Sequence, residues 1–423
     1  MAVDTFSVAT ICGEAKRASR VLAQLDTGIK DAALLAMADA LTERAGEILE
    51  ANARDMEAGA DGDLGDALLD RLALTPTRLA GMAEDVRRIA ALPDPVGEVI
   101  EGRRLPNGLD LRKLRVPLGV VAVVYEARPN VTIDCSALCL KSGNAIVLRG
   151  SSIAAHSNAV LASVAAEAVT AAGLSEGSVS LVAGGGHEEL AELATASESV
   201  DLIIPRGGEG LKRALSAVAT VPVIYAAAGN CHVYVDASAD LEAARAITLN
   251  AKLQRPGTCN SAETLLVHRE AAPEFLPATI ADLLTAGVEL RVDGRTRALA
   301  GDAADALLHA TEEDYATEFL ALTLAVRVVD SAEEAIEHVN RFSSGHSEAI
   351  VTSSTAAARA FTGGVDAACV YVNASTRFTD GGQFGLGAEI GNSTQKLHAR
   401  GPIGLRELGT FKYVVEGAGH TRP

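Results

Sequence analysis

The sequence predicts an α/β protein built from two doubly wound units. Short runs of β-branched residues alternate with helical stretches from residue 120 to residue 372, and the strand runs are almost continuously apolar. This pattern is typical of parallel sheets that are covered by helices on both faces. The chain has 423 residues, of which 48% are hydrophobic. That length allows two or three domains with a substantial core.

The first 92 residues are expected to be mainly helical, because apolar residues such as Leu34, Met37 and Leu41 recur at helical spacing over residues 14–92. Thr75 followed by Pro76 is typical of a helix start. Residues 98–118 differ, because a Pro-Asn-Gly turn at residues 106–108 separates two extended segments. This turn predicts a β-hairpin. An isolated hairpin is only marginally stable, so we expect it to pack on something else, such as a neighbouring subunit.

Two strand and helix series follow. The first has the character of a nucleotide-binding unit, with strands expected at residues 120–125, 145–149, 179–183, 200–205 and 221–225 and helices near 133–142, 155–172, 187–196 and 209–219. The second has strands expected at residues 233–235, 264–267, 288–292, 322–329, 349–352 and 369–372 and helices near 240–253, 272–286, 302–310, 331–340 and 355–361. The tail is glycine-rich and then extended at residues 411–415.

Charge and composition exclude several classes of protein. The formal net charge is −18, and aromatic residues make up only 3% of the chain, with no Trp. Such a chain is repelled by nucleic acid and by anionic membranes, and it offers no surface for stacking bases. The sequence shows no secretory signal and no apolar run long enough to span a membrane. We therefore expect a cytoplasmic protein that binds neither nucleic acid nor membrane.

The six cysteines do not form a disulfide framework at this chain length. Cys135 and Cys139 lie on one face of an expected helix, but no His or Cys follows at zinc-site spacing, so we predict no metal and a core position for both. Cys259 differs, because it lies in the irregular segment Gln-Arg-Pro-Gly-Thr-Cys-Asn at residues 254–260. A thiol on such a turn suits nucleophilic attack on a carbonyl. A structural cysteine explains the residue equally well at this point.

Several long motifs resemble the aldehyde dehydrogenase superfamily, and within it the γ-glutamyl phosphate reductase family. They are YEARPNVTID, KSGNAIVLRGSS, DLIIPRGGEGL, QRPGTCNSAETLLVH and HARGPIGLRELGTFKYVV, in this order along the chain. The resemblance implies an aldehyde dehydrogenase-like fold. It implies a Rossmann-type cofactor-binding domain at residues 1–100 and 116–230, an α/β catalytic domain at residues 231–399, and a β-hairpin oligomerisation arm at residues 101–115 and 400–423.

The resemblance also implies the chemistry, which is the NADPH-dependent reduction of L-glutamyl 5-phosphate to L-glutamate 5-semialdehyde in proline biosynthesis. Cys259 would form a thioester with loss of phosphate, and the Asn130 side chain would stabilise the oxyanion together with the Cys259 backbone N–H. A turn residue after Pro129 is the alternative for Asn130. Residues 226–230 lack the glutamate base of hydrolytic aldehyde dehydrogenases, so the thioester is not left to water.

NADP(H) is the expected cofactor. Arg149, Ser151 and Ser152 follow the second strand and offer a cation and hydroxyls where NAD-selective proteins carry an acid. A surface arginine in a loop is the alternative for Arg149. Glycine turns that open two helices can approach the pyrophosphate, although each is a weak signal alone. Glu318 resembles the glutamate that binds the nicotinamide ribose, or it is a loop carboxylate. The turn residues predicted to contact cofactor are Gly184, Gly186, Arg206, Gly207 and Gly208.

The substrate carries two anionic groups, which arginines recognise well. Arg128, Arg255 and Arg377 lie in loops expected to border Cys259, and structural ion pairs explain them equally well. His346 and His398 lie in similar loops, but a structural role is favoured for both. The implied partners are another copy of the chain and glutamate 5-kinase, since acyl phosphates hydrolyse readily. Two alternatives stay open, namely a reductase or CoA-acylating dehydrogenase of another acyl donor, and a catalytically silent relative that acts as a binding protein.

Overall fold

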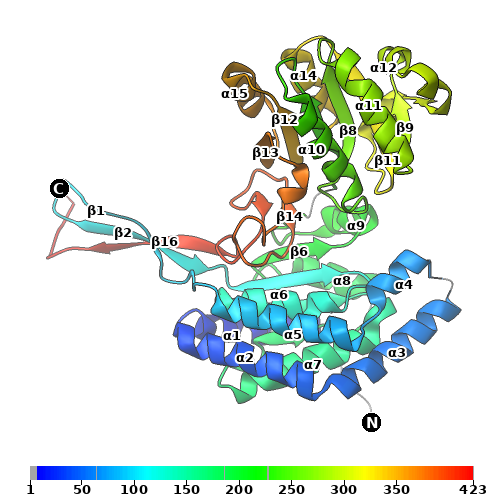
Figure 1. Cartoon of the computed structure of the whole chain (residues 1–423). Coiled ribbons are helices and arrows are strands. Elements are labelled where there is room, and N and C mark those ends of the chain that lie inside the picture. The colour runs from blue at the N-terminus through cyan, green and yellow to red at the C-terminus, as the bar shows by residue number, and fades with distance from the viewer. Residues whose placement is uncertain (1–6, 63, 185, 226–227, 423) are drawn as a thin grey trace. The chain divides into compact units, whose positions relative to one another are not determined.

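The structure is a computed structural model that describes residues 7–62, 64–184, 186–225 and 228–422. The chain forms two compact units (Figure 1). Unit 1 comprises Met1–Ala226, Leu386–Gly391 and Ile403–Pro423, and unit 2 comprises Ala227–Gly385 and Asn392–Pro402. The sequence-based division after residue 230 differs in placing residues 386–391 in the second domain. The roles assigned to the domains remain predictions.

Unit 1 contains a four-stranded parallel sheet in the order β5-β4-β3-β6. Its strands are β3 (Val120–Tyr125), β4 (Ala145–Gly150), β5 (Val179–Leu181) and β6 (Leu202–Arg206). Every residue of β3 and β4 is buried, as expected for strands covered on both faces. The helices are α1 (Val8–Leu22), α2 (Thr27–Glu43), α3 (Ala45–Asp61), α4 (Asp66–Leu72), α5 (Pro76–Ala91), α6 (Asn130–Lys141), α7 (Ala155–Ala171), α8 (His187–Thr195) and α9 (Glu209–Val218).

The helices at the start of the chain form a further layer of unit 1. Helix α2 packs on α5, α6 and α7, while α1 contacts β4 and α8. The Thr75 side chain accepts a hydrogen bond from the Arg78 backbone N–H and Pro76 is the first residue of α5, so the predicted helix start is confirmed.

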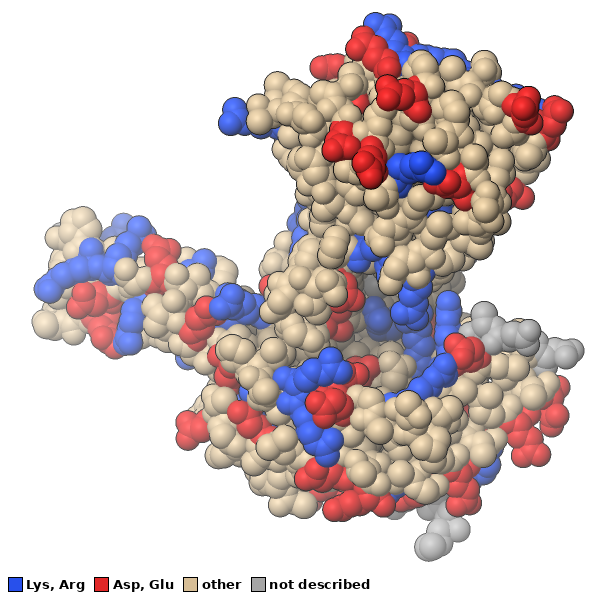
Figure 2. Space-filling view, in the orientation of Figure 1, with Lys and Arg blue, Asp and Glu red and all other residues tan. Residues whose placement is uncertain are grey.

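The predicted hairpin is also confirmed. Strands β1 (Val99–Arg104) and β2 (Asp110–Pro117) pair antiparallel, and Gly108 adopts a φ of 91° at the turn between them. Strand β16 (Gly409–Glu416) pairs with β2 and completes a three-stranded sheet that we call the arm. Acidic and basic side chains alternate on the arm (Figure 2), for example in the Arg112–Glu416 and Arg115–Glu98 ion pairs.

Unit 2 is built on a seven-stranded sheet in the order β10-β9-β11-β8-β7-β12-β13, in which every pairing is parallel. One face forms a core with α10 and α11, and the other with α14 and α15. The strands are β7 (Cys231–Val235), β8 (Ala262–His268), β9 (Glu289–Val292), β10 (Leu308–His309), β11 (Thr323–Val329), β12 (Ser347–Val351) and β13 (Cys369–Val372). The helices are α10 (Leu241–Leu253), α11 (Ala272–Thr285), α12 (Gly294–Leu299), α13 (Glu312–Ala316), α14 (Ala332–Phe342) and α15 (Thr355–Gly364).

Short elements complete the structure. They are the 3₁₀ helices η1 (Ser152–Ala154), η2 (Gly301–Ala306) and η3 (Thr376–Phe378), and the bridging strands β14 (Asn392–Ser393) and β15 (Gly401–Pro402). In the described part of the chain no helix is both long and apolar enough to cross a membrane.

Two sequence-based expectations are wrong. Residues 221–225 form only a single bridge, between Val223 and Ile203 of β6, because Pro222 has no N–H to extend a ladder. The helix expected at residues 302–310 is instead η2 followed by the short strand β10. An apolar run with an alanine-rich start does not distinguish a helix from a turn that leads into an edge strand.

Candidate active site

Cys259 lies in unit 2, on the turn between α10 and β8. Its side chain is half-buried, whereas the other five cysteines are buried. A second segment of the chain fixes this turn, because the Asn260 amide donates to the Thr379 carbonyl at 2.9 Å and the Thr376 hydroxyl donates to the Asn260 carbonyl at 2.7 Å. These bonds hold a partly accessible thiol on a defined backbone.

Arg377 is the cation that the structure places beside this turn. Its guanidinium donates to the Gln254 side-chain oxygen and to the Thr258 hydroxyl, both at 2.8 Å. Burial and the neighbouring charge of Arg255 lower the pKa of Arg377, while the charge of a Cys259 thiolate raises it. The predicted grouping of Arg255 and Arg377 around Cys259 therefore occurs, although Arg377 also anchors the turn. Arg128 belongs to unit 1, where its carbonyl accepts from the Val131 N–H at the start of α6.

Gly229 lies against the back of the Cys259 turn. A Cβ atom added at Gly229 would overlap the Cys259 carbonyl oxygen, so the close approach requires glycine. The Gly229 N–H donates to Glu318 at 2.6 Å. Burial raises the pKa of Glu318, and the hydrogen bond from Gly229 opposes that shift. Glu318, the predicted ribose-binding carboxylate, is thus linked to the Cys259 turn through one glycine.

A buried ion pair supports the same region. Lys252 and Glu263 are both fully buried, and their side chains meet at 2.5 Å. The second oxygen of Glu263 accepts from the Leu320 N–H at 3.2 Å, two residues after Glu318. Because both charges are removed from water, each is stabilised by the other, and loss of one would leave an uncompensated buried charge. The pair therefore fixes the segment that carries Glu318 relative to β8.

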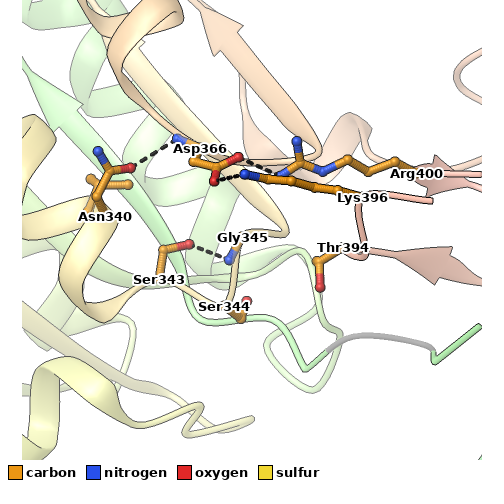
Figure 3. A pocket seen from close by; sticks show the side chains of 9 residues that line it. Asn340, Ser343, Ser344, Gly345, Asp366, Thr394, Lys396 and Arg400 are labelled. Carbon is orange, nitrogen blue, oxygen red and sulfur yellow. Dashed lines mark hydrogen bonds and ion pairs between the residues drawn. The ribbon is translucent and has the colours of Figure 1, made fainter.

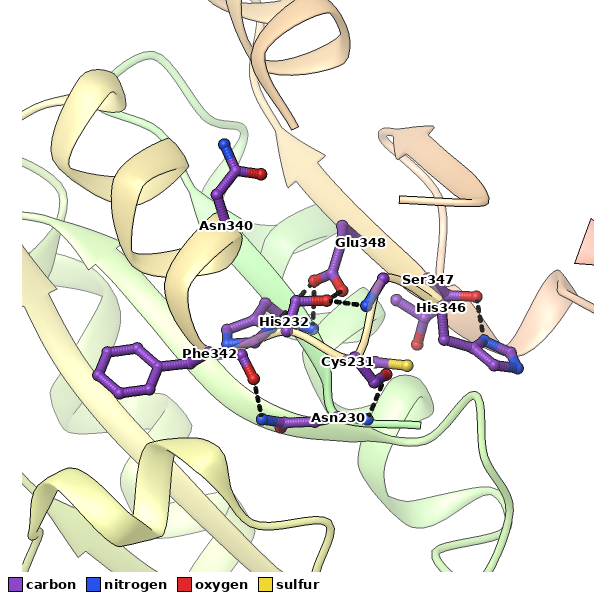
Figure 4. A network of polar contacts seen from close by, with 12 residues as sticks. Asn230, Cys231, His232, Asn340, Phe342, His346, Ser347 and Glu348 are labelled. Atoms are coloured by element: carbon purple, nitrogen blue, oxygen red, sulfur yellow. Dashed lines mark hydrogen bonds and ion pairs between the residues drawn. The ribbon is translucent and has the colours of Figure 1, made fainter. Parts of the chain in front are cut away.

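A polar network continues behind the turn (Figure 4). The Asn230 amide donates to the Tyr315 and Phe342 carbonyls at 2.7 and 2.8 Å, and Glu348 accepts from the backbone N–H of His232 at 2.7 Å. The Cys231 thiol donates to the Cys259 carbonyl at 3.2 Å. Burial raises the pKa of Cys231 well above its usual range, so Cys231 is not a competing nucleophile.

His346 does not supply a cation to this region. It is buried, bonds to the Ser347 hydroxyl at 2.8 Å, and burial lowers its pKa to about 4. The imidazole is therefore neutral at pH 7, in agreement with the structural role favoured for it.

A polar cavity of about 440 Å³ opens elsewhere in unit 2 (Figure 3). Ser343, Ser344 and Thr394 line it together with Lys396 and Arg400. Both cations pair with Asp366. An anionic ligand would have to compete with that carboxylate.

Asn130 is the first residue of helix α6 in unit 1. Its side-chain amide donates to Asp134, one helical turn later, at 2.8 Å. The other oxygen of Asp134 is buried and has no hydrogen-bond partner in the described residues. Burial raises the pKa of Asp134 to about 6, the Asn130 bond and the charge of Arg206 oppose that rise, and the charge of Asp85 adds to it.

The predicted cofactor residues of unit 1 lie at one end of its sheet, because they follow the carboxyl ends of its parallel strands, whereas Glu318 belongs to unit 2. The Arg149 guanidinium is largely buried and donates to the Gly186 carbonyl at 2.6 Å, and its Nε has no partner in the described residues. Ser151 accepts a long bond of 3.4 Å from the Ala127 N–H, and Ser152 is exposed. Gly185, between the two predicted glycines, lies outside the described residues, as do residues 226 and 227 of the segment that lacks a base.

Carboxylates face two of the predicted glycine turns. Glu126 accepts from the Gly208 N–H at 3.1 Å, at the start of α9. Glu189 lies close to Gly184 and Gly186. Burial lowers the pKa of Arg149, and the charge of Glu189 opposes that shift. A pyrophosphate that approached these turns would have to displace or reorient these acids.

Arg206 differs from the other predicted cofactor residues. Its guanidinium packs on the backbone of Gly391, where a Cβ atom would overlap it, and its charge acts on Asp134. The side chain therefore extends toward the residues around Asn130.

Sequence reasoning missed Asp134, Gly229, Lys252 and Glu263. The i, i+4 spacing of Asn130 and Asp134 was the one available signal for a contact. Across residues 7–62, 64–184, 186–225 and 228–422, no group of three or more His, Cys, Asp or Glu side chains could hold a metal ion.

Comparison with known proteins identifies relatives along nearly the whole chain. The model of the aldehyde dehydrogenase family matches residues 2–298 and 311–396. The γ-glutamyl phosphate reductase of Thermobifida fusca is 53% identical over 98% of both chains, and that of Moorella thermoacetica is 55% identical over 96% of this chain and 97% of the relative. The crystal structure of γ-glutamyl phosphate reductase from Thermotoga maritima has a TM-score of 0.96 and 46% identity, over 99% of this chain and all of that one. An acetylating aldehyde dehydrogenase from Geobacillus thermoglucosidasius shares the fold at a TM-score of 0.68 and 19% identity, over 98% of this chain and 97% of that one.

Proposed function

This chain belongs to the aldehyde dehydrogenase family, and we propose that it reduces L-glutamyl 5-phosphate to L-glutamate 5-semialdehyde and phosphate with NADPH, as a step of proline biosynthesis. The Cys259 turn carries the proposal, because it combines a half-buried thiol, a fixed backbone and the charges of Arg255 and Arg377. The names of the relatives that are more than 50% identical support the choice of substrate.

The chain's residues have separate tasks in this reaction. The Cys259 thiolate attacks the acyl carbon of the substrate, the bond from that carbon to the phosphate oxygen breaks, and a thioester forms. NADPH, when bound, supplies the hydride that reduces the thioester carbonyl. Asn130 donates a hydrogen bond to the oxygen that becomes negative in both steps. Collapse of the reduced species breaks the carbon–sulfur bond and releases the aldehyde and the Cys259 thiolate. Arg255 and Arg377 hold the anionic groups of the substrate, and Arg128 remains a further candidate for this role.

The reverse reaction tests the assignment and separates it from its closest rival. We expect the protein to reduce NADP⁺ in the presence of L-glutamate 5-semialdehyde and inorganic phosphate, with no comparable rate when coenzyme A replaces phosphate. Acyl transfer to phosphate is expected because phosphate is the leaving group of the forward reaction. Turnover with coenzyme A and not with phosphate would instead indicate an acylating dehydrogenase. Absence of turnover with either would favour a binding protein.

Arg149, Ser151 and Ser152 support NADP(H) as the cofactor. A cation and two hydroxyls at the end of β4 fit a phosphorylated ribose, and the buried Nε of Arg149 still lacks a partner among the described residues. Glu318, Gly184, Gly186, Arg206, Gly207 and Gly208 remain predicted cofactor contacts.

The Arg149→Ala variant should raise the KM for NADPH about 10- to 100-fold, because a hydrogen bond to a charged group contributes about 1.5–3 kcal/mol. The KM for NADH should change much less. Steady-state kinetics with both cofactors measure the difference. Arg87→Ala is the matched control, since Arg87 pairs with Asp39 on the surface of the same unit. Equal losses for the two cofactors would remove Arg149 from this role.

We propose that the arm joins two copies of the chain. Phe411, Tyr413 and Val415 alternate along β16 and are all exposed, as are Val99 and Ile100 of β1. Exposed apolar side chains in a row are typical of a surface that a partner covers. A cytoplasmic location and a contact with glutamate 5-kinase remain predictions.

A further inference from the structure

We propose that Asp134 is a positioning residue that orients the Asn130 amide for oxyanion binding. The inference rests on the proposed function and adds to it a residue that acts only through Asn130. Both residues lie on helix α6, at positions i and i+4, so their side chains share one face.

A carboxylate decides which end of the amide faces it. An ionised carboxylate only accepts hydrogen bonds, so the NH₂ group of Asn130, and not its carbonyl oxygen, must point toward Asp134. The 2.8 Å bond uses one of the two N–H donors. The second N–H is then held in a fixed direction as a donor, and the amide oxygen points elsewhere. A preorganised donor is what stabilisation of an oxyanion requires.

Burial of Asp134 destabilises the folded protein, and close packing of helix α6 does not require a carboxylate at this position. The Asp134 Oδ1 is buried without a hydrogen-bond partner in the described chain, and a buried unsatisfied polar atom destabilises the folded state. A hydrophobic side chain on this face of α6 would avoid that cost. A carboxylate at this position is explained if its other oxygen is needed to hold the Asn130 amide.

The groups around Asp134 set when it is ionised. Asn130 faces it from the same helix, Asp85 acts on it from α5, and Arg206 acts on it from the end of β6. Burial raises the Asp134 pKa to about 6, so the carboxylate is ionised at pH 7.5 and becomes protonated on moderate acidification. A protonated Asp134 can donate to the amide oxygen, which would turn the NH₂ group away.

A double-mutant cycle tests the proposal in the phosphate-dependent reduction of NADP⁺. Asn130→Ala should lower kcat about 10²- to 10³-fold. Asp134→Leu should lower kcat about 10- to 100-fold with little change in KM, as partners that orient a functional group often do. In the Asn130→Ala background, Asp134→Leu should have almost no further effect, because the group it orients is gone. Ser136→Ala is the matched control, since it removes a buried hydroxyl from the same helix that donates to the Thr132 carbonyl at 2.6 Å.

The Asp134→Asn variant gives a second measurement that a purely structural role would not affect. Its amide oxygen can still accept from Asn130, but it does not titrate. The ratio of its kcat to that of the wild type should therefore rise as the pH falls through about 6. This comparison decides the question if Asp134→Leu does not fold.

The outcomes distinguish the role of Asn130 from the role of Asp134. If Asn130→Ala leaves kcat unchanged, the proposed oxyanion role of Asn130 itself is wrong. If Asn130→Ala is impaired but the effects of Asn130→Ala and Asp134→Leu are additive, or the pH ratio is flat, Asp134 does not act through Asn130.

Discussion

Replacing Cys259 by alanine should lower the rate of phosphate-dependent NADP⁺ reduction by on the order of 10⁶-fold, to the background rate. Losing a covalent nucleophile has an effect of this size, because no other group can form the intermediate. The remaining cysteines cannot substitute for it. Cys231, whose thiol donates to the Cys259 carbonyl, is fully buried, and burial raises its pKa well above the usual range. Stopped-flow and steady-state assays of the purified variant measure the loss.

The control for this prediction is Cys12→Ala. Cys12 is fully buried in α1, and burial raises its pKa to about 11, so it is an inert core thiol. Its replacement should leave turnover within about threefold of the wild type and change mainly the melting temperature. If Cys259→Ala retained more than one-tenth of the wild-type rate, the thioester mechanism would be wrong.

Much of the fold was accessible from the sequence, because its signals are local. Almost continuously apolar runs marked β3 and β4, since strands buried on both faces carry few polar residues. A Pro-Asn-Gly turn marked the hairpin, and Thr75 with Pro76 marked the start of α5. The strand predicted at residues 221–225 was wrong because one proline outweighs the β propensity of its neighbours. The helix predicted at residues 302–310 was wrong because a short apolar run does not show whether its residues repeat with the period of a helix or of a strand.

Residues of the candidate site could be predicted from the sequence only where the side chain is of a kind that rarely occurs in such a segment. Cys259 stood out as a thiol on an irregular turn, and Arg377 as a cation in a loop. Gly229 could not be found in this way, because its role depends on a carbonyl 30 residues later in the chain. Lys252 and Glu263 look like ordinary surface charges in the sequence, and only the structure shows that they are buried together.

The net negative charge of the chain bears on the arginines near Cys259. A chain with a formal charge of −18 must bind two anionic ligands under the proposed function. Arg377 and Arg255 lie together at the Cys259 turn, where burial and the charge of Arg255 lower the pKa of Arg377. Such a pair is costly when no anion is bound, and it is compensated when one binds. An anionic substrate would supply that compensation under the proposed function.

Replacing Gly229 by alanine should lower kcat by at least about 10²-fold, the second largest loss expected here. The new Cβ atom would overlap the Cys259 carbonyl oxygen, so the nucleophile turn must shift, and a shift of about 1 Å at the reacting atoms can cost that much. The same shift would disturb the bond from the Gly229 N–H to Glu318. Cofactor affinity should therefore fall together with kcat, which is measurable by titrating NADPH fluorescence.

Gly363→Ala is the matched control for Gly229→Ala. Gly363 lies in α15 of the same unit, and a Cβ atom added there has no neighbour within 4 Å. Replacing a helical glycine without steric conflict should raise stability by about 0.4–1 kcal/mol and leave turnover unchanged. If Gly229→Ala also retained wild-type turnover, the turn would have to be free to move. The close packing of Gly229 against the Cys259 carbonyl would then not be needed for the reaction.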